Sequence, residues 1–242
     1  MPDGVSIRSG FSTSPRTTIA AACSALIAPI GTSFPVGAII GVDTSGMWML
    51  VNVMWSDSVS VDTTLANASS GIGRASAIAV AERGGTVFAL ARNGSALDDL
   101  VAEIRAGGGQ AHAFTCDVTD SASVEHTVKD ILGRFGHVDY LVNNAGRSIR
   151  RSVVNACDRM HDYERTMAVN YFGAVRMTLA LLPHWRERRF GHVVNVSSVG
   201  VQAHSPKYSA YVPTKAALDA FANVVSTETL SDHITFTNIH MP

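Results

Sequence analysis

From about residue 61 onward, short apolar runs alternate with longer segments whose apolar residues recur at helical spacing. The apolar runs predict strands at 86–91, 111–115, 138–142, 192–196 and 234–239. The intervening segments predict helices over 75–83, from a capping-box pattern at 95–98 to the glycines at 107–109, and over 121–134, 161–188 and 208–230. Strands and helices that alternate in this way are typical of βαβ units. We therefore expect an α/β protein with a doubly wound parallel sheet covered by helices on both faces.

The first 60 residues have a different composition. Residues 17–61 contain no Lys or Arg, and the small, apolar stretch 17–40 resembles a signal peptide or a membrane span. Pro29 and Pro35 interrupt that stretch, and the apolar run 47–55 is too short to cross a bilayer as a helix. We interpret 1–60 as an N-terminal extension of unknown structure, either poorly ordered or the product of a misplaced start, before a domain over 61–242. A membrane-anchored protein is the alternative that this segment leaves open.

Composition and charge narrow the class of protein. The chain has 242 residues, of which 46% are apolar, and its net charge is −1. That content argues against disorder, and that charge argues against nucleic-acid binding or docking on an acidic membrane. The three cysteines form no CxxC pair and the histidines show no metal-ligand spacing, so we predict no metal site and a reduced, cytoplasmic protein.

A glycine-containing turn precedes an alanine-rich helix at residues 68–74 (ASSGIGR). Glycines between a strand and a helix let the backbone approach a pyrophosphate, which then lies at the helix N-terminus. The signal is weak by itself, because such turns are common. The segment before the turn, 58–65 (SVSVDTTL), only alternates in polarity, so it is a poor candidate for the central strand of the sheet.

Two arginines bear on the choice of cofactor. Arg92 stands at the end of the next predicted strand, where NAD-specific sites usually place an acidic residue for the ribose 2′-hydroxyl. A basic residue there accommodates a 2′-phosphate, and Arg74 lies close by in the turn. A solvated surface charge is the alternative for each arginine, but their joint placement favours NADP(H) over NAD(H).

A tyrosine and a lysine four residues apart suggest acid–base chemistry. Tyr211 and Lys215 share one face of the predicted helix 208–230. A neighbouring ammonium lowers the pKa of a phenol, which makes the phenol a usable proton donor near neutrality. Ser198 lies 13 residues before Tyr211, just after a predicted strand, where its hydroxyl would face the ligand crevice. The pair alone is also compatible with two ordinary helix residues.

Together these motifs make the chain similar to the classical short-chain dehydrogenases/reductases, from about residue 61 to residue 242. The segment 68–73 resembles most of the cofactor turn of that family, and Asn143-Asn144-Ala145-Gly146 matches its NNAG segment. Asn170, Ser198, Tyr211 and Lys215 match its catalytic tetrad in order and spacing, and Asp117 with Val118 resembles its adenine contact. The resemblance implies a Rossmann-like fold and an NADP(H)-dependent oxidoreductase that interconverts a carbonyl and an alcohol. The implied cofactor-binding residues are Asn67, Ser69, Ser70, Gly71, Ile72, Gly73, Arg74, Arg92, Asp117, Val118, Asn143, Asn144, Ala145, Gly146, Tyr211 and Lys215.

The resemblance also implies a role for each member of the tetrad. Tyr211 would exchange the proton with the substrate oxygen, and Ser198 would fix that oxygen by a hydrogen bond. Lys215 would lower the pKa of Tyr211 and bind the nicotinamide ribose. Asn170 would hold a water that links Lys215 to solvent. Asn143 and Asn144 would shape the cofactor site.

A closer resemblance points to the reductase domain of bacterial long-chain fatty acyl-CoA reductases. The segments 162–176, 181–198 and 231–242 carry it. It implies a fatty aldehyde or acyl thioester as the small-molecule substrate. Arg147, Arg150 and Arg151 could meet CoA phosphates there, although a solvated loop is the simpler interpretation.

Three departures from the family favour an alternative. Ala66-Asn67 stands where the family has Thr-Gly, the first strand is weak, and the chain ends at Pro242, before the last strand and the substrate-binding helices of the family. From these departures we expect a truncated domain with weak cofactor binding and little turnover. A non-catalytic remnant is therefore the alternative function. A homo-oligomer, formed through the helices that hold Asn170 and Tyr211, is expected if the fold is complete.

Overall fold

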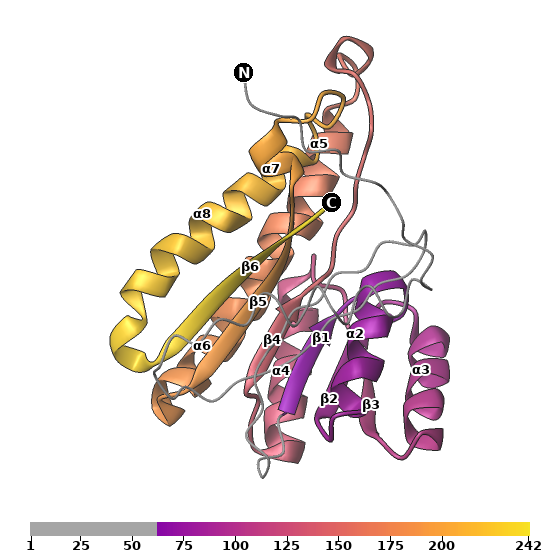
Figure 1. Cartoon of the computed structure of the whole chain (residues 1–242), viewed down its shortest axis with the longest axis vertical. Helices are drawn as coiled ribbons and strands as arrows, with labels where there is room; N and C mark the ends of the chain where they lie inside the picture. Colours follow the sequence, from indigo (N-terminus) through magenta and orange to yellow (C-terminus); the bar gives the residue numbers. More distant parts are fainter. Residues whose placement is uncertain (1–61) are drawn as a thin grey trace, which may run out of the picture. The chain divides into compact units, whose positions relative to one another are not determined.

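A computed structural model describes residues 62–242 of the chain (Figure 1). The predicted extension 1–60, its apolar stretches and the proposed domain boundary at residue 61 lie outside the described residues. None of the helices within 62–242 has the length and apolar character needed to cross a bilayer.

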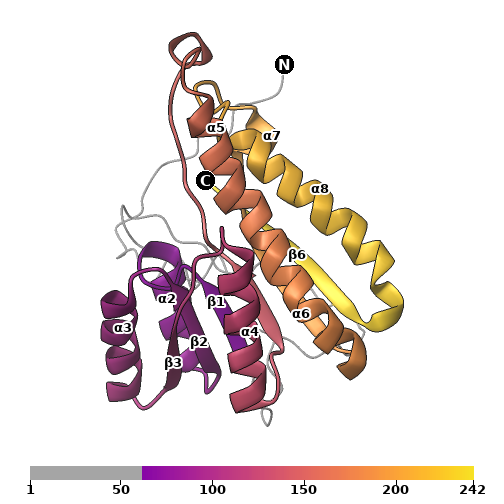
Figure 2. The same cartoon turned by 180° about the vertical axis from the view of Figure 1, so that it is seen from behind.

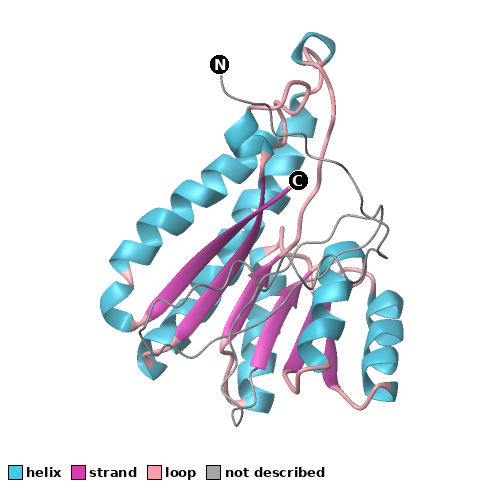
Figure 3. Cartoon of the chain, in the orientation of Figure 1, coloured by secondary structure: helices cyan, strands magenta, loops and turns pink. Residues whose placement is uncertain are grey.

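The described residues form a doubly wound parallel sheet, as predicted (Figure 3). Its six strands lie in the order β3-β2-β1-β4-β5-β6, and every neighbouring pair is parallel. The strands are β1 (Asp62–Ala66), β2 (Thr86–Ala91), β3 (Gln110–Thr115), β4 (Tyr140–Asn143), β5 (Gly191–Ser198) and β6 (Ile234–Met241). The strand order reverses between β1 and β4, and ligands of such sheets bind at the carboxyl ends of the strands near this point.

Helices cover both faces of this sheet (Figures 1 and 2). One apolar cluster joins the sheet to α2 and α3, and a second joins it to α4 and α6. The helix α8 packs on β5 and β6 and on the helical turns before α6. The helices are α2 (Gly71–Ala81), α3 (Gly94–Ala106), α4 (Ser121–Phe135), α5 (Met160–Met167), α6 (Ala174–Arg188), α7 (Gly200–Ala203) and α8 (Val212–Glu228), and the shorter turns are η1 (Val153–Asn155), η2 (Ala168–Gly173) and η3 (Leu230–Asp232).

The strand β1 overturns one prediction, since the segment before the glycine turn is a central strand after all. All five residues of β1 are buried, and the strand pairs with β2 on one side and β4 on the other. Leu65 and Ala66 point into the two apolar clusters on opposite faces. The β-branched Thr63 and Thr64 suit a pleated strand although they are polar. Pairing with two neighbours, which the local sequence does not encode, places this strand at the centre.

Several helix boundaries also differ from the predictions. The helix predicted from the capping box at Ser95 begins at Gly94, and its N-cap is Asn93, whose side chain accepts a hydrogen bond from the Ala96 amide at 3.3 Å. The helix predicted over 75–83 already begins at Gly71. The helix predicted over 208–230 spans α8, with Tyr211 as its N-cap residue. The segment predicted as one helix over 161–188 contains a π-helical turn at η2.

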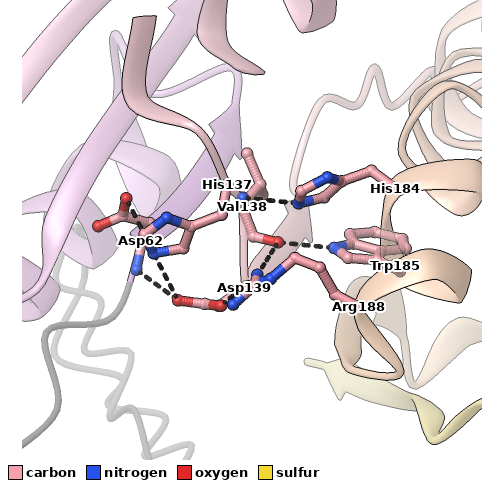
Figure 4. Close-up of polar contacts among 7 residues, drawn as sticks. All are labelled: Asp62, His137, Val138, Asp139, His184, Trp185 and Arg188. Carbon is pink, nitrogen blue, oxygen red and sulfur yellow. Dashed lines mark hydrogen bonds and ion pairs between the residues drawn. The ribbon is translucent and has the colours of Figure 1, made fainter. Parts of the chain in front are cut away.

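A polar cluster joins the amino ends of β1 and β4 to α6 (Figure 4). The Asp139 carboxylate accepts hydrogen bonds from the Asp62 amide at 3.1 Å and from the Arg188 guanidinium at 2.8 Å. The indole of Trp185 donates to the Val138 carbonyl at 2.8 Å. The cluster lies at the edge of the sheet opposite to the predicted site and fixes the start of the two central strands.

Candidate functional site

The predicted phosphate-binding turn connects β1 to α2. The Ala68 amide donates to the Leu90 carbonyl at 3.0 Å, which anchors the turn to β2. Asn67, which stands where the family has glycine, adopts a left-handed conformation with φ of 59°, which asparagine tolerates better than most residues. A Cβ on Gly73 would lie 2.2 Å from the Asn67 carbonyl oxygen and 2.6 Å from the Asn144 amide nitrogen. Only glycine fits at residue 73 because the turn and β4 meet there.

The start of α2 is open to a ligand. Gly71 has a φ of 54°, and no atom of residues 62–242 lies within 4 Å of the place where its Cβ would stand. Ser70, the N-cap residue, makes no side-chain capping hydrogen bond, so its hydroxyl does not compete for the first amides of the helix. This arrangement fits a pyrophosphate at the helix N-terminus. Ser69, Ile72 and Arg74 are partly exposed around the same turn.

Asparagine side chains connect three strands beside this turn. The Asn143 amide donates to the Asn195 side-chain oxygen at 2.9 Å, and the Asn195 amide donates to the Asn238 side-chain oxygen at 2.9 Å. The three residues face one another in register on β4, β5 and β6. The side-chain oxygen of Asn143 is buried and has no partner within the described residues. Asn144 donates to the Asn67 carbonyl at 3.2 Å and so ties β4 to the turn.

The two arginines predicted to select the cofactor lie in different surroundings. The Arg92 side chain is 77% exposed at the end of β2, and its guanidinium stands 4.0 Å from the Asp117 carboxylate. Arg74 forms an ion pair with Glu103 of α3. Desolvation raises the pKa of Asp117, but hydrogen bonds from Thr119 and the charge of Arg92 outweigh it and hold that pKa below its usual value. Arg92 is therefore the arginine better placed to meet an added phosphate.

Asn170 is fully buried in the π-helical turn η2. Its side-chain oxygen accepts from the Arg147 amide at 2.7 Å, and its side-chain nitrogen donates to the Arg147 carbonyl at 3.0 Å and to the Thr214 hydroxyl at 2.9 Å. π-Helical turns inside α-helices are frequent at functional sites. Asn170 thus connects the loop after β4 to the start of α8.

Lys215 is 3% exposed, in the first turns of α8. Its ammonium donates to the Val196 carbonyl of β5 at 2.7 Å. Burial lowers the pKa of Lys215 to about 8, and the carboxylate of Asp219 counteracts that effect in part. A Cβ on Gly146 would lie 3.6 Å from this ammonium, so the NNAG segment borders Lys215 directly.

The structure corrects the prediction for Tyr211. Lys215 was expected to lower the pKa of Tyr211, but burial raises that pKa above its usual value in the ligand-free structure. The Ser198 hydroxyl counteracts the rise as a hydrogen-bond partner of Tyr211. The ammonium of Lys215 is bound instead to the Val196 carbonyl of β5.

The remaining predicted residues surround this centre at various distances. Val118 lies after β3 and packs closely on Gly173 of η2. Arg147 and Arg150 are exposed in the loop after β4, whereas Arg151 lies 3.4 Å from the buried Asp162 carboxylate. Within residues 62–242, no group of His, Cys, Asp or Glu side chains could hold a metal ion.

Sequence reasoning missed Thr214 and the partners of Asn143. The Thr214 hydroxyl donates to the Tyr211 carbonyl at 2.6 Å and accepts from Asn170, so it links two members of the tetrad. Its position next to Lys215 was the available signal. Asn195 and Asn238 gave none, because only the strand register brings them beside Asn143.

Comparison with known proteins shows the family to which the chain belongs. The short chain dehydrogenase family matches residues 64–242, and the chain belongs to this family. An uncharacterized oxidoreductase of Mycobacterium tuberculosis is 49% identical over 176 residues, which are 72% of this chain and 52% of that protein. A protein named fatty acyl-CoA reductase from Acinetobacter baylyi is 48% identical over 178 residues, which are 74% of this chain and 60% of that protein. The chain thus spans little more than half the length of these relatives.

Solved structures show the same fold. A short-chain dehydrogenase from Streptomyces avermitilis is 39% identical with a TM-score of 0.69, over 75% of this chain and 65% of that one. A metagenomic short-chain oxidoreductase in complex with NADP is 25% identical with a TM-score of 0.71, over 76% of this chain and 83% of that one. An NAD⁺-bound xylitol dehydrogenase is 28% identical with the same TM-score, over 74% of this chain and 69% of that one. Both nicotinamide cofactors therefore occur among the structural relatives.

Proposed function

We propose that the protein is an NADP(H)-dependent oxidoreductase that interconverts a carbonyl and an alcohol, with a fatty acyl compound as its substrate. The observation that carries this proposal is the convergence of Ser198, Tyr211, Lys215 and Asn170 at the carboxyl ends of the strands. Tyr211 stands beside Ser198, Lys215 lies under the NNAG segment, and Asn170 connects both sides of the centre.

Each residue has a distinct chemical part in this proposal. Bound NADPH supplies the hydride that the carbonyl carbon accepts. The Tyr211 hydroxyl donates its proton to the carbonyl oxygen in reduction and regains it in oxidation. The Ser198 hydroxyl donates a hydrogen bond to the same oxygen and fixes its position. The ammonium of Lys215 lies one helical turn from Tyr211. In this proposal it stabilises the phenolate once the cofactor is bound, against the burial that raises the pKa of Tyr211 in the ligand-free structure.

The exposed Arg92 supports NADP(H) over NAD(H). Arg92 directly follows β2, at the position where NAD-specific sites usually have the carboxylate that binds the ribose 2′-hydroxyl, and its side chain is 77% exposed. A planar guanidinium binds phosphate oxygens by paired hydrogen bonds. The open start of α2 would receive the pyrophosphate of the same cofactor.

The loop after β4 supports a fatty acyl-CoA or fatty aldehyde substrate. Figure 1 shows this segment running past the carboxyl ends of the strands before it returns into α5. It presents the exposed Arg147 and Arg150, whose charges suit CoA phosphates, and exposed apolar side chains at Val153 and Val154. The relative from Acinetobacter baylyi bears the name fatty acyl-CoA reductase, which supports the same substrate class.

Two further parts of the proposal concern the protein's surroundings. Phe172, Leu179 and Val224 expose apolar side chains on η2, α6 and α8, which supports a homo-oligomer formed through these helices. A cytoplasmic location agrees with the buried, unpaired thiol of Cys116. Sedimentation of the purified chain and fractionation of expressing cells test these two points.

Thermal melts with each nucleotide test the cofactor. At a hundred times its dissociation constant, NADP⁺ should stabilise the chain by about 2.7 kcal/mol, and NAD⁺ at equal concentration should stabilise it less. Arg92→Leu should remove most of the NADP⁺ effect and leave that of NAD⁺ unchanged. Arg83→Leu, an exposed arginine of the loop after α2, is the matched control. If neither nucleotide raised the melting temperature, the cofactor assignment would be overturned and the non-catalytic remnant would be favoured.

The oxidation of NADPH by a long-chain aldehyde tests the proposed carbonyl reduction, and the absorbance of NADPH measures its rate. Tyr211→Phe should lower kcat by at least about a hundredfold, since general acid catalysis contributes that much. The variant should keep the NADP⁺-induced rise in melting temperature. Tyr208→Phe, at the neighbouring ring, should retain activity. Turnover by Tyr211→Phe at the wild-type rate would contradict the assignment.

A further inference from the structure

A carboxylate and an imidazole lie next to the proposed catalytic residues Tyr211 and Lys215. Tyr211, Lys215 and Asp219 follow one another at intervals of four residues, so they lie on one side of the helix. The Asp219 carboxylate is hydrogen-bonded to the His240 imidazole of β6 at 2.8 Å. None of the roles described above uses Asp219 or His240.

The carboxylate is largely buried, whereas the His240 side chain is 29% exposed. The Asp219 side chain is 13% exposed, and its second carboxylate oxygen is buried with no hydrogen-bond partner within residues 62–242. The strand register places Ser197 beside His240, and the Ser197 hydroxyl is also buried without a partner among those residues. A half-satisfied buried carboxylate is costly, so its position calls for a compensating charge.

Lys215 is the cation that stands one turn away from this carboxylate. The ammonium donates to the neutral Val196 carbonyl of β5, and the NNAG segment borders it at Gly146. From β6, His240 faces Asp219 rather than the ammonium. Asp219 is therefore the anion of the described residues that acts on Lys215.

We infer that Asp219, oriented by His240, is a positioning residue that keeps Lys215 protonated at neutral pH. The inference deepens the proposed function, because only a protonated Lys215 stabilises the Tyr211 phenolate. Burial lowers the pKa of Lys215 to about 8, and the Asp219 carboxylate prevents a further fall. Without that carboxylate, a larger share of Lys215 would be neutral at pH 7 and the tyrosine would lose its electrostatic support.

The lysine content of the chain permits a direct test. The sequence contains only Lys129, Lys207 and Lys215, so a chain labelled with ¹³C at the lysine ε-carbon gives three signals. Lys→Arg variants of the first two assign them, and these lysines then serve as internal references. Asp219→Asn, which keeps the size and shape of the side chain, should lower the pKa of Lys215 by about one unit. Glu228→Gln, the same charge change at an exposed position of α8, should leave it unchanged.

Variants of His240 separate orientation from charge. His240→Leu leaves the Asp219 carboxylate without the partner that orients it, and should lower the pKa of Lys215 as Asp219→Asn does. His240→Gln keeps a hydrogen-bond donor and should preserve the wild-type value. Equal titration of Lys215 in the wild type and in Asp219→Asn would overturn the inference. Equal effects of Gln and Leu at residue 240 would overturn the orienting role of His240.

The titration uses the ligand-free chain, so its result does not depend on the proposed reaction. A chain that reduces no aldehyde but shows the shift in Asp219→Asn would contradict the proposed function and leave the electrostatic coupling in place. A chain whose activity depends on Tyr211 but whose Lys215 titrates alike in both forms would contradict this inference alone. In an active chain, Asp219→Asn should also shift the pH dependence of kcat, which loss of packing alone would not do.

Discussion

The strands of the central sheet begin at one end of the sheet, here called the amino edge, and finish at the other, the carboxyl edge. Buried polar groups are paired at the amino edge and partly unpaired at the carboxyl edge. At the amino ends of the strands, the Asp139 carboxylate binds a backbone amide and a guanidinium, and the side chains around it are also paired (Figure 4). At the carboxyl ends, Asn143, Ser197 and Asp219 each keep a buried polar atom without a partner among the described residues. Lys215 adds a buried ammonium there.

This difference separates a stabilising region from a region built for chemistry. Satisfied buried networks strengthen a fold, whereas unpaired buried polar groups cost stability and are retained where they serve a ligand. The amino edge fixes where β1 and β4 begin, and the carboxyl edge holds the proposed site. The free energy of unfolding of variants at each edge tests this difference.

The largest loss is expected from Asp139→Ala. The substitution leaves the Arg188 guanidinium and the Asp62 amide without their acceptor. Because Arg188 is about a third exposed, the loss of these two hydrogen bonds should cost about 3 kcal/mol. Urea unfolding at pH 7 measures the loss. Glu187→Ala, an exposed carboxylate of α6 near the same edge, should change the stability by less than about 0.5 kcal/mol. A loss below about 1 kcal/mol in Asp139→Ala would mean that the amino edge is not the stabilising one.

At the carboxyl edge, Lys215→Met should increase the free energy of unfolding instead of lowering it. The pKa of Lys215 falls from 10.5 to about 8 on folding, a difference that corresponds to about 3 kcal/mol. Because the unfolded state binds more protons between these two values, the contribution of Lys215 to stability rises as pH increases from 8 to 10.5. At pH 7, Lys215→Met should therefore raise the free energy of unfolding, by up to about 3 kcal/mol.

The pH dependence of that gain is the check. At pH 10.5 the ammonium is lost from the folded state, so the variant and the wild type should differ by less than about 1 kcal/mol. Lys207→Met, a lysine in the exposed turn before α8, is the control and should show no such pH dependence. A gain that persists unchanged at pH 10.5 would show that packing rather than charge causes it.

The sequence could indicate candidate residues at the carboxyl edge but not the polar cluster at the amino edge. Ser198, Tyr211 and Lys215 could be found because their residue types and spacing are properties of one segment of chain. The role of β1 could not, since its three polar residues are buried only through pairing with β2 and β4. The Asp139 cluster is equally non-local, because its partners come from β1 and α6.

The pKa shift of Tyr211 could not be predicted from the sequence either. The spacing of Tyr211 and Lys215 predicted a phenol with a lowered pKa, yet burial raises the pKa of Tyr211 in the ligand-free structure. Spacing gives proximity along a helix but not the burial of each group or its other partners. The Val196 carbonyl, which holds the lysine, is visible only once β5 lies beside α8.

An intermediate loss is expected in the asparagine ladder of β4, β5 and β6. Asn195→Ala removes the acceptor of Asn143 and the donor to Asn238, so it should cost about 2 kcal/mol. Asn238→Ala, at the less buried end, removes one hydrogen bond and should cost about 1 kcal/mol. Urea unfolding of both variants gives the comparison. Equal losses of stability in the two variants would show that the ladder does not act as a connected network. A larger loss in Asn238→Ala than in Asn195→Ala would contradict the central place of Asn195 in the ladder.

The smallest expected effect comes from a helix cap at the carboxyl edge. Asn93 caps α3 with a side-chain hydrogen bond from the Ala96 amide, and removing such a cap costs about 1 kcal/mol. Asn93→Ala should therefore be destabilising in urea, although it lies beside Arg92 on the side of the proposed cofactor. Ser95→Ala, at the residue that the local pattern favoured as the cap, should change the stability by less than about 0.5 kcal/mol. If Ser95→Ala cost more than Asn93→Ala, the capping box would be the working cap after all. With the expected order, the Asn93 side chain stabilises the start of α3 at the carboxyl edge, and Ser95 is not its cap.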